Sequence, residues 1–504
     1  MSFQFPKIVI AGGGSSGWIA AALLAKQLEP FGCEIELVES ESVGTIGVGE
    51  ATIPPIISFL NHLGIDEQDF IRSTQATFKL GIEFRNWHSL GQSYLHPFGE
   101  KGWPIEGFDF YQCWLKAKLN GEGSSYTDFS PAGVMGKNNR FFLPFKLPKE
   151  SPLASAAYAL HFDASLVGKY LSNYAQSKGV KRTEGDIVEV KQNAEGFLEK
   201  LVLQTGKEVL GDFFIDCTGF HSLLIEKTLK SDYENWQQWL PCDRAIVAQS
   251  SKLKTLSPLT LSTAHEAGWQ WTIPLQTRTG NGYVHSSKHV SEEDAKATLL
   301  NNIQGELLHE PRVISFKTGA RKEMWVKNCV SLGLSSGFLE PLESTTIHLV
   351  TSALGVLVDL LPQKTHSQNL ADAFNKKMFE EYSRIRDFII LHYCTTVRED
   401  SEFWLYCKNM EIPQSLENKI ALFRERALVQ GGRDDFFRDA NWYCIFEGMG
   451  VRPKTYDPFV DLCEFEKIQK ILRESKPGLQ ALVERLPLHE DFIVENCKAI
   501  DAKL

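Results

Sequence analysis

The stretch Ile8-Val9-Ile10-Ala11-Gly12-Gly13-Gly14-Ser15-Ser16-Gly17 decides the fold. A short apolar run enters a glycine-rich turn, and residues 18–28 continue as a helix-like apolar run. A second apolar run, residues 34–38, ends at Glu39, about 20 residues after the glycines. This order of strand, turn, helix, strand and acid predicts a Rossmann-like βαβ unit that binds a dinucleotide.

The residue types in this stretch suit a dinucleotide for separate physical reasons. Gly12 permits the tight turn, and Gly14 lets the backbone approach a pyrophosphate. The helix that follows, with Ser15 and Gly17 in its first turn, directs N–H groups and a positive dipole end toward the phosphates. The carboxylate of Glu39 can accept hydrogen bonds from ribose hydroxyls. A glycine-rich loop without a ligand is the alternative, and the combination of strand, helix and acid argues against it.

Similar patterns recur much later in the chain. Residues 46–54 are a second glycine-rich stretch, and apolar strands at 213–217 and 329–332 each run into small residues. Strands followed by small-residue loops so far apart indicate one α/β cofactor module assembled from separated stretches. The residues of these loops that we expect at the cofactor are Gly49, Ala51, Gly333 and Gly337.

The pattern changes near Thr346. From here apolar residues fall at steps of three and four, as on the buried face of a helix that Ser344 or Thr345 would cap. Further helical segments are predicted at 379–391, 416–429 and 465–472. We therefore predict a discontinuous α/β cofactor module with insertions over residues 1–360, for a flavin or a nicotinamide nucleotide, and a mainly helical region over residues 361–504, without a sharp boundary between them.

Composition narrows the classes of function. Hydrophobic residues make up 43% and charged residues 23%, as in an ordinary globular protein. The 53 Lys and Arg against 63 Asp and Glu leave a net charge of −10, which argues against nucleic-acid binding. The 10 cysteines form no CxxC pair, so we predict reduced thiols and a cytoplasmic location. The N-terminus has no basic leader and the apolar run 18–25 is short, so neither export nor a membrane anchor is expected.

Three further positions carry residues that could take part in a reaction. From their patterns alone, each has a functional and a purely structural interpretation. Trp269 and Trp271 lie two residues apart, hence on one face of a strand, where packing a sheet is the plain alternative. Lys79 begins an alternating pattern that is also typical of a strand with a solvated face. Glu343 precedes the helix near residue 346, and the alternative for this acid is a purely structural role at the helix dipole or as a cap.

Together these motifs resemble those of the flavin-dependent halogenases of the tryptophan-halogenase family. The family hallmark W-x-W-x-I-P is present in full at residues 269–274. The other motifs that match, in family order, are GxGxxG at 12–17, GVGEATIP at 47–54, Phe78-Lys79-Leu80-Gly81-Ile82 and Pro341-Leu342-Glu343-Ser344-Thr345. The matches run from residue 8 to about residue 450, most of the chain.

The resemblance implies that residues 1–360 form a Rossmann-like FAD-binding module of the aromatic-hydroxylase type and that the helical region 361–504 binds the substrate. FAD is the expected cofactor, delivered in the reduced form FADH2 by a separate flavin reductase. In the family, reduced flavin and dioxygen form a C4a-hydroperoxide, which a halide attacks. The resulting hypohalous acid passes through an internal tunnel to a small, electron-rich aromatic substrate. The chain has no second nucleotide fingerprint, which fits a reductant supplied in trans. This chemistry needs no metal, and a homodimer is left open.

The resemblance also assigns roles to residues. Lys79 is the catalytic lysine, whose ammonium binds or captures hypohalous acid, and Glu343 stabilises the cationic arenium intermediate while Ser344 relays a proton. The halide is expected at the backbone N–H groups of Thr345 and Thr346. The barrier between flavin and substrate, which disfavours direct oxygen transfer, is expected from Trp269, Trp271, Ile273 and Pro274. The substrate residues are expected to be His96, Phe98, Trp442 and Tyr443.

Two positions depart from the family pattern. Thr346 stands where glycine is expected, and its β-branched side chain would reshape the anion pocket, so we hypothesise a preference for bromide over chloride. Trp442 stands where tyrosine is expected, which favours the broad prediction of an indole-like arene over free tryptophan alone. The alternatives are a flavin-dependent aromatic hydroxylase, which has no use for Lys79 paired with Glu343, and a non-catalytic flavin-binding protein.

Overall fold

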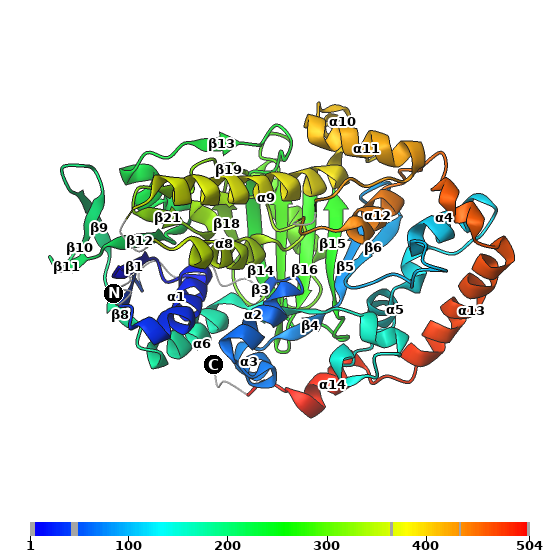
Figure 1. Ribbon diagram of the computed structural model, residues 1–504, viewed down its shortest axis with the longest axis horizontal. Coiled ribbons are helices and arrows are strands. Elements are labelled where there is room, and N and C mark those ends of the chain that lie inside the picture. The colour runs from blue at the N-terminus through cyan, green and yellow to red at the C-terminus, as the bar shows by residue number, and fades with distance from the viewer. Residues whose placement is uncertain (1–5, 42–48, 363–365, 433–434, 501–504) are drawn as a thin grey trace.

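The computed structural model describes residues 6–41, 49–362, 366–432 and 435–500. At one end of the molecule lies a six-stranded sheet with the order β20-β21-β12-β1-β2-β8 (Figure 1). Its centre is β1 (Ile8–Ala11), which pairs in parallel with β2 (Ile35–Glu39) and β12 (Phe213–Asp216). The outer strands are β8 (Lys181–Glu184), β21 (Cys329–Ser331) and β20 (Trp325–Val326). Segments near 213 and 329 thus join the sheet of the fingerprint, which confirms an α/β module assembled from separated stretches.

Helix α1 (Ser15–Leu28) follows β1 almost directly and starts at Ser15 instead of at Trp18. Gly14 is still extended, with φ −71° and ψ −176°, so the turn ends there and the helix begins with the next residue. All residues from Trp18 to Ala25 are buried, because α1 packs against β1, α6 (Ala164–Ser177) and α8 (Thr346–Leu360). The start of the helix therefore faces the carboxyl ends of the parallel strands.

A seven-stranded sheet occupies the middle of the molecule, with the order β18-β14-β17-β16-β15-β5-β6 (Figure 1). Its strands are β18 (Arg312–Ser315), β14 (Arg244–Ser251), β17 (Arg278–His285), β16 (Gly268–Pro274), β15 (Leu259–His265), β5 (Gly81–Arg85) and β6 (Ser93–Pro97). The Trp-x-Trp motif lies on β16, between two antiparallel neighbours. The indole of Trp271 covers Gly282, where a Cβ would lie 2.1 Å from the ring, so this position needs glycine.

Lys79 ends one strand and does not begin a long one. Strand β4 (Thr77–Lys79) pairs with β7 (Ala159–Asp163), in a three-stranded sheet with β3 (Gly49–Ala51), whereas the next strand, β5, belongs to the seven-stranded sheet. The side chain of Lys79 is fully buried, so the alternative of a solvated strand face is wrong. The alternating pattern favoured a single strand with a solvated face because the sequence does not show that the chain passes from one sheet to another at Leu80.

Small sheets and helices complete the region before residue 340. The remaining strands are β9 (Ile187–Gln192), β10 (Leu198–Leu203), β11 (Glu208–Leu210), β13 (Tyr233–Asn235), β19 (Gly319–Arg321) and β22 (Gly337–Phe338). The helices are α2 (Pro55–Leu63), α3 (Glu67–Thr74), α4 (Phe110–Leu119), α5 (Pro131–Lys137) and α7 (Glu292–Asn302).

Beyond Phe338 the described residues form helices and loops but no β-strand. After α8 come α9 (Gln368–Cys394), α10 (Glu402–Asn409), α11 (Gln414–Arg426), α12 (Asp439–Gly448), α13 (Phe465–Val483) and α14 (His489–Asn496). The helices predicted from periodicity correspond to α9, α11 and α13, each with different bounds. Helices α8 and α9 lie side by side in Figure 1 and pack together, so a boundary near residue 360 stays a prediction.

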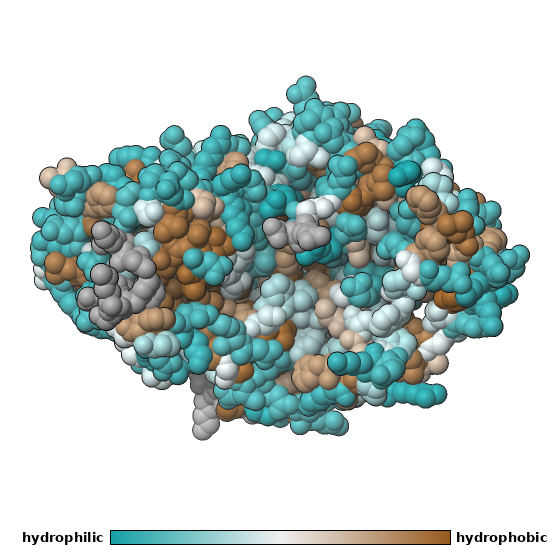
Figure 2. All heavy atoms as spheres, in the orientation of Figure 1, coloured by the Kyte–Doolittle hydropathy of each residue, from teal (hydrophilic) through white to brown (hydrophobic). Residues whose placement is uncertain are grey.

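No helix in the described ranges has both the length and the apolar character needed to cross a bilayer. All ten cysteines are free thiols. The face drawn in Figure 2 is largely hydrophilic, with apolar side chains gathered in separate patches. This exterior agrees with a chain in which charged residues make up 23%.

Candidate active site

A cavity of about 860 Å³ opens at the carboxyl ends of the parallel strands, the usual ligand site of such sheets. The predicted cofactor residues that line it are Gly12, Gly14, Ser15, Glu39, Gly49 and Ala51. Thr218, just after β12, adds to the wall, so all three central strands reach the cavity. Gly47 and Val48 of the second glycine-rich stretch lie outside the described residues.

The backbone at the cavity floor fits a dinucleotide. Gly12 has φ +106°, and a Cβ there would lie 2.3 Å from the carbonyl oxygen of Cys217. Gly14 has open space around its Cα, which leaves room for a phosphate. In the part of the chain that the structure describes, no side chain caps the start of α1, so the first N–H groups of this helix can bind an anion.

Glu39 is held in place by protein groups before any ligand binds. Its Oε2 accepts a hydrogen bond from Nε1 of Trp18 at 3.1 Å, and its Oε1 accepts one from Arg182. The carboxylate lies over Gly13, where a Cβ would collide with it. The glycine-rich turn therefore also makes room for the acid that the sequence predicts at the ribose.

Gly17, Gly333 and Gly337 do not line the cavity but lie close behind its wall. A Cβ at Gly17 would lie 1.9 Å from the backbone oxygen of Gly12, and one at Gly333 would lie 2.2 Å from Oγ of Ser16. The side chains that line the cavity near the last two glycines are those of Leu332, Leu334 and Phe338. These glycines therefore shape the site by allowing close packing.

Lys79 meets the cavity through Ser344. Ser344 lines the cavity, and its Oγ accepts a hydrogen bond from Nζ of Lys79 at 2.9 Å. The same Nζ lies 5.3 Å from the ring centroid of Phe98. Burial lowers the pKa of Lys79 to about 7, although the charge of Glu343 opposes this shift. Near neutral pH the side chain is therefore present both as an ammonium and as a free amine.

Glu343 is the buried carboxylate that the sequence predicts, but histidines hold it. Its Oε2 lies 2.9 Å from Nδ1 of His96, and its Oε1 lies 3.1 Å from Nε2 of His392. Among the described residues no ion pair joins Glu343 directly to Lys79. Burial alone would raise the pKa of Glu343, but the charge and hydrogen bonds of the two histidines lower it to about 2. Glu343 is thus ionised near neutral pH and does not serve as a helix cap.

The turn before α8 differs from the predicted cap. Thr345 is the N-cap residue, yet its side chain makes no capping hydrogen bond, and the hydroxyl of Ser344 is engaged by Lys79. The prediction of a side-chain cap is therefore wrong. In the described part of the chain Oγ1 of Thr345 is buried without a partner, and Thr346 lines the cavity. An open helix start with a free hydroxyl suits an anion.

The Trp-x-Trp motif forms one wall of the cavity. Trp269 and Trp271 both line it, with ring centroids 6.0 Å apart and planes tilted by 55°. Ile273 lines it as well, whereas the backbone oxygen of Pro274 accepts a hydrogen bond from Oγ1 of Thr77 at 2.7 Å. The motif therefore touches the cavity and is also tied to β4, the strand that carries Lys79.

Three of the four predicted substrate residues lie in one region. Phe98 lies under the amine of Lys79, and His96 binds the neighbouring acid. The ring of His96 lies 5.6 Å from that of Phe388, against which Trp442 packs edge-on at 4.9 Å. Aromatic rings thus lie near the buried amine and acid, although His96, Phe98 and Trp442 do not line the dinucleotide cavity.

Tyr443 lies with a different set of rings. It stacks on Tyr111 at 3.8 Å, and Tyr126 packs edge-on against it at 6.3 Å. Because neighbouring helix residues point about 100° apart, α12 directs Trp442 and Tyr443 to different surroundings. Two adjacent aromatic residues in a helix therefore do not predict one shared pocket.

His392 belongs to the site but carries no sequence signal, and Asn441, which precedes the predicted Trp442 and Tyr443, contacts it through His96. Nδ1 of His392 lies 3.0 Å from the backbone oxygen of Phe388, one helical turn earlier. Oδ1 of Asn441 lies 3.0 Å from Nε2 of His96. A lone histidine in a helix has no pattern that separates it from ordinary core residues, so only the fold reveals its partner.

Glu340 is a second buried acid in the turn that carries Glu343. Its Oε1 accepts a hydrogen bond from the hydroxyl of Tyr393 at 2.7 Å. Burial raises the pKa of Glu340 to about 8 despite this bond, so the group is mostly neutral at pH 7. One turn therefore presents a neutral acid and an ionised acid three residues apart. Two glutamates at this short spacing are the sequence signal that could have identified Glu340.

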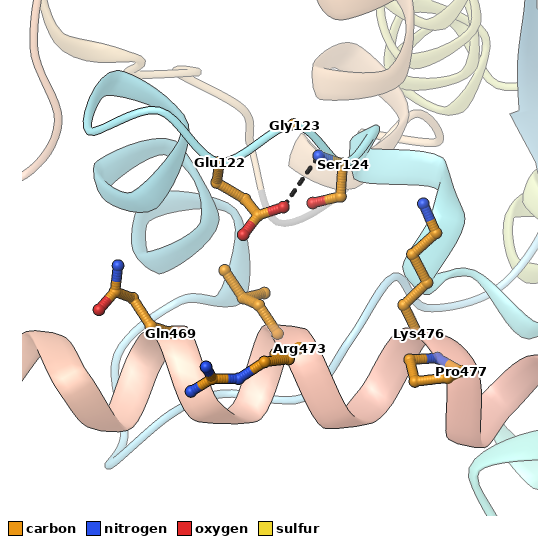
Figure 3. A pocket seen from close by; sticks show the side chains of 8 residues that line it. Glu122, Gly123, Ser124, Gln469, Arg473, Lys476 and Pro477 are labelled. Carbon is orange, nitrogen blue, oxygen red and sulfur yellow. Dashed lines mark hydrogen bonds between the residues drawn. The ribbon is translucent and has the colours of Figure 1, made fainter.

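A smaller hollow of about 410 Å³ lies between α13 and the loop at residues 122–124 (Figure 3). In it Glu122 accepts a hydrogen bond from the backbone N–H of Ser124 at 3.0 Å, and Arg473 and Lys476 come from the helix. None of the predicted site residues lies there. Within the described ranges, no group of three His, Cys, Asp or Glu side chains could hold a metal ion.

The fold and site define a dinucleotide-binding α/β enzyme with a secluded amine and acid, and the comparisons with known proteins name its class. A family model described as "Tryptophan halogenase" matches residues 7–464. The chain therefore belongs to the tryptophan halogenase family and is a flavin-dependent halogenase.

Two solved structures share the whole fold. Xcc4156, a flavin-dependent halogenase from Xanthomonas campestris, is 39% identical with a TM-score of 0.95, over 99% of this chain and 100% of that one. BrvH, a flavin-dependent halogenase from Brevundimonas sp. BAL3, is 40% identical with a TM-score of 0.94, over 98% and 99%. Among characterised sequences, tryptophan 6-halogenase SttH of Streptomyces toxytricini is 34% identical over 96% of this chain and 97% of its own.

Proposed function

We propose that the chain is a two-component, FADH2-dependent halogenase that transfers a halogen from hypohalous acid to a free, electron-rich aromatic such as tryptophan or indole. The observation that carries the proposal is the fully buried amine of Lys79, joined by Ser344 to the wall of the dinucleotide cavity. A small oxidised halogen would move from the cavity past Ser344 to Lys79. The indoles of Trp269 and Trp271 would keep an arene away from the cofactor.

FAD would be held by the glycine-rich turn, the start of α1, Glu39 and the strand β3. When bound, the reduced flavin would supply two of the four electrons that reduce dioxygen, and the halide would supply the other two as it is oxidised, so that hypohalous acid and water form. Because the chain has a single nucleotide fingerprint, a separate flavin reductase would deliver the reduced flavin. Lys79 and Glu343 then act on the hypohalous acid and on the arene.

Lys79 receives the electrophilic halogen. Its ammonium form can hydrogen-bond hypohalous acid, and its free amine can attack the halogen. In the second case an N–X bond forms, the X–O bond breaks, and the oxygen leaves as water with one amine proton. A pKa of about 7 makes both forms available at neutral pH. Either form holds the halogen at a fixed place, away from bulk water that would consume it.

Glu343 completes the substitution. As the arene attacks, a C–X bond forms and the N–X or O–X bond breaks, its electron pair staying on the nitrogen or oxygen, which takes up a proton, and the ring becomes a cation. The ionised carboxylate stabilises this cation and then takes the proton from the substituted carbon, which restores the aromatic ring. The hydroxyl of Ser344, which accepts a hydrogen bond from Lys79 and follows Glu343 in the chain, would relay a proton between the two groups.

The substrate is argued from the rings around these charges. His96, Phe98 and Trp442 lie near Glu343 and Lys79, which suits a flat, π-rich ligand. The name of the relative SttH gives tryptophan as its substrate, which supports an indole here as well. Because Tyr443 packs elsewhere, we infer an indole-like arene in general and leave free tryptophan as one member of that class.

A product analysis tests the function. The protein is incubated with FAD, a flavin reductase, NADH, bromide and indole, and a second reaction contains tryptophan. We expect a product heavier than the substrate by one bromine minus one hydrogen in mass spectrometry. Insertion of oxygen instead would identify an aromatic hydroxylase, and no product with any arene while FAD binds tightly would favour a non-catalytic flavin protein.

Thr346 is expected to set the halide preference. Its side chain lines the cavity at the start of α8, so removing it should change the space offered to the anion. We expect the wild type to turn over bromide faster than chloride, and Thr346→Gly to raise the chloride-to-bromide ratio about tenfold. Parallel assays in each salt measure this ratio, and Thr351→Gly, on the same helix, controls for the cost of a helical glycine. Chlorination equal to bromination in the wild type would contradict the prediction.

A further inference from the structure

Strand β4, which carries Lys79, is an edge strand whose free edge is covered by other segments. Among the described residues its one strand neighbour is β7, so the other edge of β4 presents peptide groups that need partners elsewhere. The N–H of Phe78 donates to Nε2 of His489 at 3.2 Å, and the N–H of Leu80 donates to the backbone oxygen of Pro258 at 2.7 Å. The residues before and after Lys79 are therefore both held by hydrogen bonds at this edge.

His489, the first residue of α14, bridges β4 to the loop before β15. Nδ1 of its ring lies 2.9 Å from the backbone oxygen of Leu256, which can only accept, so Nδ1 carries the proton. The N–H of Phe78 can only donate, so Nε2 presents its lone pair. Both partners thus select the same neutral tautomer, and burial lowers the pKa of His489 to about 4, which agrees with a neutral ring.

A second hydrogen-bonded bridge lies just before the start of β4. Nε2 of Gln276 donates to the backbone oxygen of Ala76 at 2.7 Å and to that of Cys497 at 3.2 Å. Oε1 of the same amide accepts a hydrogen bond from the N–H of Ala499 at 2.7 Å. The segment 489–499 therefore contacts β4 directly through its first residue and, through Gln276, the residue that precedes the strand.

Side-chain packing on the same segment sets the direction of Lys79. The ring of Phe78 stacks on that of Phe141 at 4.0 Å and meets the ring of Phe492, on α14, edge-on at 5.6 Å. Helix α14 accordingly lies close to β4 in Figure 1, although the two are far apart in the sequence. Because neighbouring side chains of a strand point to opposite faces, a Phe78 ring fixed in this way directs Lys79 to the other face, toward Ser344.

We propose that His489 is a positioning residue for Lys79: through the N–H of Phe78 it holds β4 so that the amine stays at the cavity wall. This inference rests on the proposed function for its catalytic meaning, whereas the hold on β4 does not depend on it. Nζ of Lys79 lies 2.9 Å from Oγ of Ser344, so a small shift of the strand breaks this contact. A halogen on a displaced amine would no longer face the arene, and hypohalous acid would escape unused.

Hydrogen exchange tests the hold on β4 without any catalysis. In His489→Asn the shorter side-chain amide reaches only the oxygen of Leu256, whereas in His489→Gln the longer one reaches the N–H of Phe78. Exchange of the Phe78 amide in the FAD-bound protein is resolved by fragmentation mass spectrometry. We expect it to be about tenfold faster in His489→Asn than in the wild type, and unchanged in His489→Gln. Equal exchange in the wild type and His489→Asn would overturn the proposal, whether or not the protein halogenates an arene.

The fate of hypohalous acid tests the consequence for Lys79. Single turnovers with bromide are analysed for brominated arene and for hypobromous acid that an excess of an added β-diketone has trapped. His489→Asn should lower the brominated arene about tenfold and raise the trapped acid to match, while the affinities for FAD and the arene stay unchanged. A protein that is merely less stable would lose both products together. His489→Gln should keep the wild-type ratio of the two products, and so should His285→Leu, which alters another buried histidine.

The two measurements separate this inference from the proposed function. A product ratio that is unchanged in His489→Asn, or that falls equally in His489→Gln, overturns the positioning role. A wild type that forms no brominated arene would instead count against the proposed function, and exchange of the Phe78 amide would still decide whether His489 holds β4.

Discussion

Lys79→Ala is expected to abolish halogenation while flavin binding remains largely intact. The amine, which can hold an electrophilic halogen, lies between Ser344 and Phe98 and beyond the residues that line the dinucleotide cavity. Hypohalous acid would still form in the variant but would have no defined place from which to react. Product formation by mass spectrometry and FAD affinity by fluorescence titration measure the two effects.

A matched control separates this loss from general destabilisation. Lys116 is another buried lysine, but its Nζ binds the backbone oxygen of Val460 and pairs with Asp461. Lys116→Ala should lower thermal stability and yet retain turnover per folded molecule. If Lys79→Ala kept regioselective product formation, Lys79 would have to be removed from the mechanism.

Glu343→Gln is expected to slow turnover by a factor on the order of 10². An amide has nearly the same shape as the carboxylate but no charge to stabilise the arenium ion and no basic oxygen for its proton. Loss of the C–H proton should then become slow, so a substrate deuterated at the reacting carbon should react more slowly in the variant and not in the wild type. Both quantities come from rapid-quench kinetics with the two substrates.

Glu340→Gln provides the control within the same turn. Since burial raises the pKa of Glu340 to about 8, this acid is mostly neutral at pH 7, and an amide reproduces its charge and its acceptor for Tyr393. Turnover should therefore change little. An unchanged rate in Glu343→Gln would reduce Glu343 to a structural residue.

Sequence reasoning located the cofactor module because its evidence is local. Each part of this evidence depends on its own stretch of backbone and not on distant partners: the fingerprint at 8–17, the acid at Glu39 and the later apolar strands. All of these strands belong to one sheet. The family motifs supplied Lys79, Glu343 and Ser344, and the structure places the first and last in hydrogen-bond contact. Their catalytic roles remain predictions.

The errors and omissions arose where distant segments decide the outcome. The strand face of Lys79 was ambiguous because the chain changes sheets at Leu80, which alternation cannot reveal. The cap expected at Ser344 failed because a lysine 265 positions away uses the same hydroxyl. His392 became recognisable only when α9 was packed beside the turn, since a single histidine has no periodicity of its own.

The backbone of the turn that carries Glu343 bears on how such an enzyme could be redesigned. Glu340 and Ser344 both have positive φ, 63° and 57°, which non-glycine residues adopt at a cost and only where the surroundings hold them. A segment fixed in this way tolerates little remodelling, since a mutation that relaxed it would also displace the acid. Libraries aimed at new arenes or new ring positions should therefore vary the aromatic rings of α9 and α12 and leave residues 340–345 untouched.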